Sequence, residues 1–188
     1  MHRLELAETV SVLTGAGISA ASGVPTFRGE GGLWKNYRPE ELATPHAFQR
    51  DPVLVWEWYS WRRDLIRNVK PNEAHFALAA MEKIIPNFVI ITQNVDNLHQ
   101  DAGNKNVIEL HGNIMRNKCF NCGRKLEAEI DLHNLPRCPD CHGLIRPDVV
   151  WFGESLPMRA IQDAHSCAQR SEVFLIIGTS GVVEPAAS

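Results

Sequence analysis

The sequence has no long apolar run and no excess of one charge. None of its segments approaches the roughly 18 consecutive apolar residues that a membrane-spanning helix needs. Its 19 basic and 22 acidic residues give a net charge of −3, without the basic excess that is common in nucleic-acid-binding proteins. We therefore expect a chain that neither crosses a membrane nor binds nucleic acid directly.

Two further absences concern the location and the architecture of the protein. The first residues, MHRLELAETV, carry mixed charge and lack the apolar stretch of a secretory signal, so we expect a cytoplasmic protein. There is no internal repeat and no low-complexity segment. A length of 188 residues, 44% of them hydrophobic, is typical of one globular core with room for a small inserted module.

Short apolar runs alternate with amphipathic segments, which is typical of an α/β fold. We predict a Rossmann-like parallel sheet with helices on both faces. Its expected strands are residues 10–13, 88–92, 107–110 and 173–177. Each strand is followed by polar residues or glycine. Because ligands of such folds bind beyond the carboxyl ends of the strands, we expect the functional site at that edge of the sheet.

Two helices are predicted from the residues at which they begin. Asp51 followed by Pro52 is typical of a helix start. The apolar residues after it recur at helical spacing and predict a core stripe of Leu54, Trp58, Trp61 and Leu65. Asn72 is expected to cap a second helix over 73–83. Residues 23–45 have no sustained period and are interpreted as a long loop with short helical turns at most.

The cysteines predict a metal site. Four of the five form two Cys-x2-Cys pairs that are 15 residues apart: Cys119, Cys122, Cys138 and Cys141. This spacing matches the four-cysteine zinc pattern, and four thiolates leave no open coordination position, so we predict one structural Zn²⁺ rather than a redox pair. Cys167 is expected to be buried or half-buried. The module is expected to span 113–148, inserted into a discontinuous main domain of 1–112 and 149–188.

A glycine turn follows the first predicted strand. Residues 15–20, GAGISA, fit the G-x-G-x-x-G/A pattern, whose glycines let the backbone approach a pyrophosphate. The pattern predicts that Gly15, Ala16, Gly17 and Ser19 bind a dinucleotide. A plain strand-to-helix turn is the alternative. Hydride transfer is disfavoured, because a dehydrogenase has a second strand ending in an acidic residue about 20 residues further on, where this sequence has WKNYRPEEL.

Read together, seven segments resemble the sirtuin family, in family order and over nearly the whole chain. They are GAGIS (15–19), GVPTFRG (23–29), TQNVDNLH (92–99), HG (111–112), the two cysteine pairs, VVWFGE (149–154) and GTS (178–180). The resemblance implies a dinucleotide-binding domain and a small zinc domain, with NAD and acyl-lysine meeting in the cleft between them. It implies an NAD-dependent protein-lysine deacylase that consumes NAD and releases nicotinamide and O-acyl-ADP-ribose.

The resemblance also implies roles for single residues. His111 is the expected base, because an imidazole can take a proton from a ribose hydroxyl near neutral pH. Asn94 is expected to act beside it, at the nicotinamide and ribose. The other implied NAD-binding residues are Thr26, Phe27, Arg28, Trp34, Gln93, Val95, Asp96, Gly178, Thr179 and Ser180. His99, in the same segment as Asn94, is expected to be structural.

Tyr59 and Arg62 resemble the Tyr-x-x-Arg of the sirtuin subclass that prefers succinyl and malonyl groups. The resemblance implies that the Arg62 guanidinium binds the acyl carboxylate. Removal of acetyl groups is expected as a second activity. The alternative is that Tyr59 packs and Arg62 is a solvated surface charge. The resemblance also implies a segment that pairs with the substrate backbone. It includes Val150, Phe152, Gly153 and Glu154. The alternative is that this segment is an ordinary edge strand.

Two other functions remain open from the sequence. A sirtuin-fold ADP-ribosyltransferase would transfer ADP-ribose instead of removing acyl groups. A zinc-ribbon binding module without catalysis is disfavoured by the acidic balance and by the polar residues that cluster at strand ends. Sirtuins normally continue with further strands that help to hold the adenosine end of NAD. We therefore expect a C-terminally truncated member that ends at Ser188.

Overall fold

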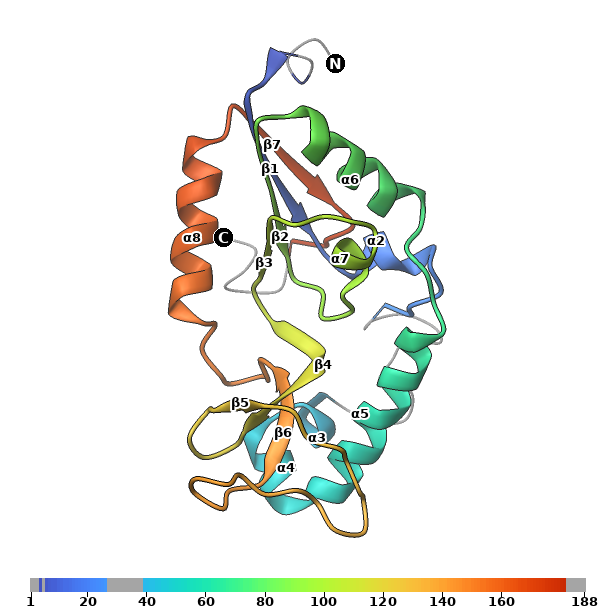
Figure 1. The fold of residues 1–188 in the computed structure, drawn as a ribbon, viewed down its shortest axis with the longest axis vertical. Helices are drawn as coiled ribbons and strands as arrows, with labels where there is room; N and C mark the ends of the chain where they lie inside the picture. Colours follow the sequence, from blue (N-terminus) through green and yellow to red (C-terminus); the bar gives the residue numbers. More distant parts are fainter. Residues whose placement is uncertain (1–3, 5, 27–38, 182–188) are drawn as a thin grey trace.

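The larger part of the molecule is a parallel sheet. The computed structural model describes residues 4, 6–26 and 39–181. Four parallel strands are arranged in the order β3-β2-β1-β7 (Figure 1). Their bounds are β1 Thr9–Thr14, β2 Asn87–Thr92, β3 Val107–Glu109 and β7 Val173–Ile177. All four predicted strands are therefore confirmed, to within one residue at either end.

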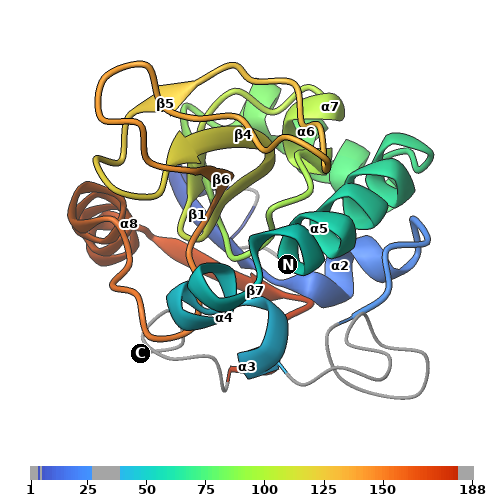
Figure 2. The same cartoon turned by 90° about the horizontal axis from the view of Figure 1, so that it is seen from below.

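Helices cover both faces of this sheet, as predicted. The helices are α2 Ala16–Ala20, α6 Glu73–Ile84, α7 Leu98–Asp101 and α8 Met158–Arg170. Val10 and Val12 of β1 pack with Leu78 of α6, whereas Ile91 of β2 packs with Ala164 of α8. Alternate residues of a strand point to opposite faces, and Figures 1 and 2 show α6 and α8 on opposite sides of the sheet.

A second, antiparallel sheet forms the other end of the molecule. Its strand order is β5-β4-β6. The bounds are β4 Gly112–Cys119, β5 Lys125–Leu126 and β6 Ile145–Val149. Helices α3 Pro39–Leu42, α4 Pro45–Arg50 and α5 Pro52–Arg67 lie beside it (Figure 2). Phe48 and Trp56 of these helices share a core with Ile114 and Trp151, so the segment before α6 packs with the cysteine-bearing part of the chain.

The start of α5 and its core stripe were predicted correctly, but the stripe is only part of the face that the helix buries. Asp51 Oδ1 accepts a hydrogen bond from the Leu54 amide at 3.0 Å, as a helix cap does. Of the predicted stripe Trp58 is buried, and the half-buried Leu54, Trp61 and Leu65 pack against the same core. The buried residues of the helix are Val55, Trp56, Trp58, Tyr59, Arg62, Arg63 and Ile66. Arg62 and Arg63 thus lie on the buried face. A prediction from the apolar pattern alone would place arginines on the solvent-facing side of the helix.

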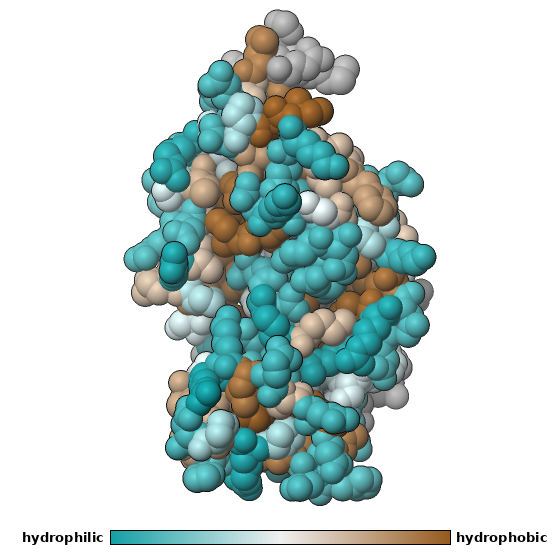
Figure 3. All heavy atoms as spheres, viewed as in Figure 1, coloured by the Kyte–Doolittle hydropathy of each residue, from teal (hydrophilic) through white to brown (hydrophobic). Residues whose placement is uncertain are grey.

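The second predicted helix is confirmed. Asn72 Oδ1 accepts from the Ala74 amide at 2.9 Å, and the Asn72 amide donates to His75 Nδ1 at 3.3 Å. In the described part of 23–45, α3 is the short helical turn that the sequence allowed. No helix of the described ranges combines the length and the apolar character needed to cross a bilayer. The face in Figure 3 is mainly hydrophilic, with apolar residues between the polar ones.

Candidate functional site

Loops from all four strands of the parallel sheet meet at its carboxyl edge. Gly15, directly after β1, donates its amide hydrogen to the Ile177 carbonyl of β7 at 3.2 Å. The Gln93 amide, directly after β2, donates to the Thr14 carbonyl of β1 at 2.9 Å. His111, after β3, contacts the Gln93 carbonyl through its ring. The expectation that the polar segments come together at this edge is therefore confirmed.

Two glycine backbones are in direct contact at this edge. The Gly17 amide donates to the Gly178 carbonyl at 2.7 Å. A Cβ on Gly17 would lie 2.8 Å from that carbonyl oxygen, and a Cβ on Gly178 would lie 2.2 Å from the Ile18 nitrogen. Gly178 also has a φ of +65°, which side chains rarely tolerate. Larger residues are therefore excluded, and the loops form a backbone cradle of the kind that a pyrophosphate can approach.

Asn94 and Asp96 are buried in one hydrogen-bond network with the glycine turn. Asn94 Nδ2 donates to the Gly15 carbonyl and to Ser19 Oγ, both at 3.1 Å. Ser19 Oγ donates to Asp96 Oδ2 at 2.7 Å, and Asp96 Oδ1 accepts from the Leu98 amide at 3.1 Å. Ser19 is completely buried. The network therefore fixes the residues after β2 against the turn after β1.

His111 is half-buried and has a defined tautomer. Its Nδ1 lies 2.9 Å from the Gln93 carbonyl oxygen. A carbonyl can only accept, so Nδ1 carries the proton and Nε2 carries the lone pair. Burial lowers the pKa of His111 below its ordinary value, with the bond to Gln93 acting in the opposite direction. The ring is therefore neutral near pH 7 and can take a proton at Nε2.

The structure describes most of the remaining predicted NAD-binding residues. Gln93 Nε2 donates to Thr179 Oγ1 at 3.1 Å, which joins the ends of β2 and β7. Gly178 and Ser180 are exposed, and Thr26 is half-buried. The Val95 carbonyl accepts from the Ile114 amide at 2.9 Å and so links the loop after β2 to the second sheet. Three predicted residues fall outside the described residues: Phe27, Arg28 and Trp34.

Tyr59 and Arg62 are both buried, with 2% and 5% of their surfaces exposed. The alternative in which Arg62 is a solvated surface charge is therefore wrong. The Trp151 indole donates to Tyr59 Oη at 2.8 Å, and the Arg62 guanidinium lies 4.7 Å from the centre of the Trp58 ring. Burial raises the pKa of Tyr59 and lowers that of Arg62.

Arg62 also lies next to the loop that contains Asn94. It lines a cavity of about 20 Å³, which is room for about one water molecule. The other residues that line this cavity are Ala16, Ser19, Val24, Pro25, Ile66, Asn94, Val95 and Asp96. Arg62, which is predicted to recognise the acyl group, is therefore a neighbour of predicted NAD-binding residues in space.

The segment 149–154 is not an edge strand, so that reading of it is wrong. β6 ends at Val149, and a turn follows in which Gly153 has a φ of +85°. The Val150 amide donates to the His111 carbonyl at 2.9 Å. Glu154 accepts from Arg146 and from the Trp151 amide, which holds its half-buried carboxylate against β6. Phe152, by contrast, is 54% exposed, and it is the large apolar side chain that this turn presents to solvent.

The four paired cysteines converge as predicted. All four sulfur atoms lie within 4.8 Å of one another. The Cys119–Cys141 and Cys122–Cys138 sulfur distances are 3.4 and 3.7 Å. Four thiolates about 2.3 Å from a zinc ion would be about 3.8 Å apart in a regular tetrahedron. The cluster therefore fits a structural zinc.

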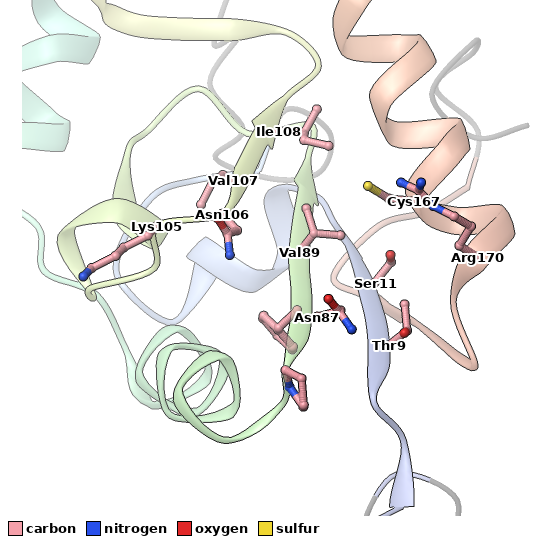
Figure 4. Close-up of a pocket in the computed structure, with 12 residues that line it drawn as sticks. Thr9, Ser11, Asn87, Val89, Lys105, Asn106, Val107, Ile108, Cys167 and Arg170 are labelled. Atoms are coloured by element: carbon pink, nitrogen blue, oxygen red, sulfur yellow. The ribbon is translucent and has the colours of Figure 1, made fainter.

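The remaining cysteine agrees with expectation, and the two histidines that flank the second cysteine pair in the sequence, His133 and His142, are exposed. Cys167 is half-buried on α8. It lines a cavity of about 790 Å³ between α8 and the starts of β1 and β2, together with Ser11, Asn87 and Val89 (Figure 4). This cavity is at the amino end of the strands and is separate from the site at their carboxyl end.

Arg63 is a buried residue of this region that sequence reasoning missed. Its Nε donates to the Ile114 carbonyl at 2.6 Å, and its NH2 donates to the Arg116 carbonyl and to Asn117 Oδ1. The pairing of β4 with β6 shifts register between Asn113 and Asn117, and Arg63 supplies the hydrogen bonds at this irregularity. No motif includes Arg63; its only sequence signal is its position beside Arg62 on an amphipathic helix.

The chain is similar to known proteins over nearly its whole length. Residues 15–185 match the model of the Sir2 family. A protein of Aquifex aeolicus named NAD-dependent protein deacylase is 57% identical over 180 residues, covering 95% of this chain and 75% of that protein. A Pyrococcus furiosus protein of the same name is 59% identical over 181 residues, covering 93% and 72%.

The fold is also similar to that of a solved structure. A mutant Sir2 homologue in complex with ADP-ribose superimposes with a TM-score of 0.93 at 47% identity. The match covers 99% of this chain and 76% of that chain. Both the sequence and the arrangement of its elements are thus shared with these proteins.

Proposed function

The chain belongs to the Sir2 family, and from this membership we propose that it is an NAD-dependent protein-lysine deacylase. Its substrates are NAD, acylated lysine side chains of proteins, and water. The products are free lysine, nicotinamide and O-acyl-ADP-ribose. The main support is the convergence at the carboxyl edge of the sheet. There the Gly17–Gly178 cradle, the Asn94 network and the free lone pair of His111 come together.

Each group has a task that suits its surroundings. NAD supplies the ribose, whose first carbon receives the acyl oxygen as nicotinamide leaves. The contact between Gly17 and Gly178 brings the turns after β1 and β7 together, and the pyrophosphate is proposed to bind along their backbone. Asn94 and Asp96 belong to the network beside the cradle, and they are proposed to meet the nicotinamide and the ribose of NAD. His111 takes a proton from a ribose hydroxyl at Nε2, while its Nδ1–H bond to the Gln93 carbonyl keeps the ring in the required orientation.

Mass spectrometry of an acyl-lysine peptide tests this function. Succinyl-lysine and acetyl-lysine versions of one peptide are incubated with the protein, with and without NAD. We expect NAD-dependent loss of the acyl group, with O-acyl-ADP-ribose appearing in equal amount. A mass increase of the peptide or of the protein by one ADP-ribose, without acyl loss, would identify the alternative ADP-ribosyltransferase instead. Intact peptides and unconsumed NAD would contradict both enzymatic functions.

Arg62 and Tyr59 support a preference for acidic acyl groups. A charge-assisted hydrogen bond of about 1.5–3 kcal/mol corresponds to roughly a 10- to 100-fold preference for succinyl over acetyl. We expect Arg62→Met to remove most of this preference by lowering kcat/KM for succinyl-lysine while largely sparing acetyl-lysine. Arg62→Lys keeps the charge but loses the planar fork, so an intermediate preference is expected.

Arg63→Met is the matched control for Arg62→Met. Arg63 is the adjacent buried arginine, and its hydrogen bonds go to Ile114 and Asn117 of the second sheet. Its replacement should lower thermal stability and affect both peptides equally. The acidic-acyl assignment fails if Arg62→Met reduces kcat/KM for both peptides by the same factor, as Arg63→Met is expected to do.

A further inference from the structure

His99 is a buried histidine that the proposed reaction does not use. It lies on α7 with 1% of its surface exposed. Its Nε2 is 2.9 Å from the hydroxyl of Thr14, the last residue of β1. The sequence suggested only a structural role for it. Its hydrogen bond nevertheless leads toward the candidate site.

The direction of this hydrogen bond follows from the next one. Thr14 Oγ1 donates its single proton to Thr92 Oγ1 at 2.9 Å. Thr14 can therefore only accept from His99, so the ring carries its proton on Nε2. The unprotonated Nδ1 is consistent with this tautomer, since it is buried and has no hydrogen-bond partner among the described residues. The relay thus runs from His99 through Thr14 to Thr92.

The relay ends at the backbone of Asn94. Thr92 Oγ1 also accepts from the Asn94 amide at 3.0 Å. This bond sets the position from which the Asn94 side chain reaches the Gly15 carbonyl and Ser19 Oγ. A hydroxyl is needed at both strand ends for this arrangement, because valine would fill the same space without donating or accepting. The relay therefore joins the ends of β1 and β2 to the residue expected to contact NAD.

The surroundings keep His99 neutral. Its ring packs against the ring of His75 from α6, with centroids 4.9 Å apart. Burial, and secondly the neighbouring His75, lower the pKa of His99 to about 4. Burial likewise lowers the pKa of His75, with Asp96 acting in the opposite direction. The single proton on Nε2, and with it the direction of the relay, is therefore retained at neutral pH.

We propose that His99 is a positioning residue for the deacylation, which acts through Thr14 and Thr92 to hold Asn94 in its working orientation. The proposal depends on the proposed function, because it assumes that Asn94 meets NAD. It assigns His99 a task in the reaction that is distinct from filling the core.

Two substitutions of His99 separate positioning from packing. His99→Gln keeps an N–H donor near the position of Nε2, whereas His99→Met fills similar space without a donor. We expect His99→Met to lower kcat about 5- to 10-fold, the effect of roughly one hydrogen bond, with KM for the acyl peptide changed less than twofold. His99→Gln should recover most of kcat. Circular dichroism and zinc content are measured on both variants, so that activity is expressed per folded molecule.

A purely structural histidine would give a different result. In that case both variants would lose thermal stability while kcat per folded molecule stayed at the parent value, and this would overturn the proposal. A His99→Gln variant no more active than His99→Met would also overturn it. Thr14→Ser and Thr14→Val repeat the test at the next residue of the relay, with serine expected to preserve kcat and valine to lower it.

The tautomer gives a readout that does not depend on turnover. The ¹⁵N spectrum of the histidine side chains should show a neutral, Nε2-protonated His99 from pH 6 to pH 8. An Nδ1-protonated or charged ring would overturn the relay. If the parent protein removes no acyl group, the proposed function has failed, and the relay is judged from this spectrum and from ADP-ribose affinity. The affinity, measured by calorimetry, should then be weaker for His99→Met than for His99→Gln.

Discussion

Changing His111 to alanine is expected to lower kcat/KM for deacylation by about 100- to 10,000-fold, the usual contribution of a positioned general base. The reason is geometric. Nδ1 is bound to the Gln93 carbonyl, so the lone pair of Nε2 is the group that can take a proton. The variant should still bind ADP-ribose, because the Gly17–Gly178 cradle does not include the imidazole. The measurement is the rate of acyl-peptide turnover at saturating NAD, beside the affinity for ADP-ribose.

His133→Ala is the control for this variant, because His133 is exposed and lies outside the site. It should retain parent activity. A His111→Ala variant with more than a tenth of parent kcat/KM would contradict the assignment of the base. Equal loss of activity in both variants would mean that the assay reports damage to the fold instead.

The same residue predicts the pH dependence of the reaction. Burial lowers the pKa of His111 below 6.5, and the neutral ring is the active form. Activity should therefore be lost as the pH falls through this lowered pKa, and be present above it. A profile of log kcat/KM against pH is expected to show an acid limb with its midpoint below 6.5. That limb should be absent from the residual activity of His111→Ala.

The strands and the metal cluster were predictable because their signals are local. Residues 173–177 form a continuous apolar run, which predicts a buried strand. Cys119 and Cys122 have the spacing of a cysteine pair in a zinc site. The glycine turn at Gly15 was read from its pattern, yet the reason for Gly17 became visible only in its contact with Gly178. A motif identifies such a residue, whereas its partner is set by the fold.

The errors and omissions all involve polar groups that find distant partners. A solvated Arg62 was left open as an alternative and Arg63 was not singled out, because a sequence does not show which arginines have an aromatic ring or a strand irregularity to contact. The hydrogen bond of His99 to Thr14 was not predicted, since the two residues are 85 positions apart in the sequence. The turn after Val149 was read as a possible strand, although its amides bond to His111 and Ala43. Predictions from sequence patterns use residues that are close in the chain, so they do not include these long-range contacts.

Replacing Cys138 with serine is expected to unfold the cysteine-bearing end of the molecule. Cys138 is fully buried, yet the core around the sulfur atoms is small. Its other buried members are Cys119 and Ile145. Structural zinc contributes roughly 10–16 kcal/mol to the folding of small zinc modules, which is comparable to the whole stability of a typical domain, about 5–15 kcal/mol. The apolar contacts of this cluster are too few to replace it.

The unfolding caused by Cys138→Ser should extend beyond the cysteine cluster to the helices that pack against it. Trp56 of α5 donates its indole N–H to the Ile145 carbonyl at 2.9 Å, and Trp151 packs between Tyr59 and Phe48. Zinc content measured by atomic absorption should therefore fall together with the fluorescence signature of buried tryptophan and with deacylation. Chelation of the parent protein should reproduce these changes. Cys167→Ser, a half-buried thiol on α8 outside the cluster, should change none of them. A Cys138→Ser protein that keeps full zinc occupancy and the parent melting temperature would exclude a structural metal at this site.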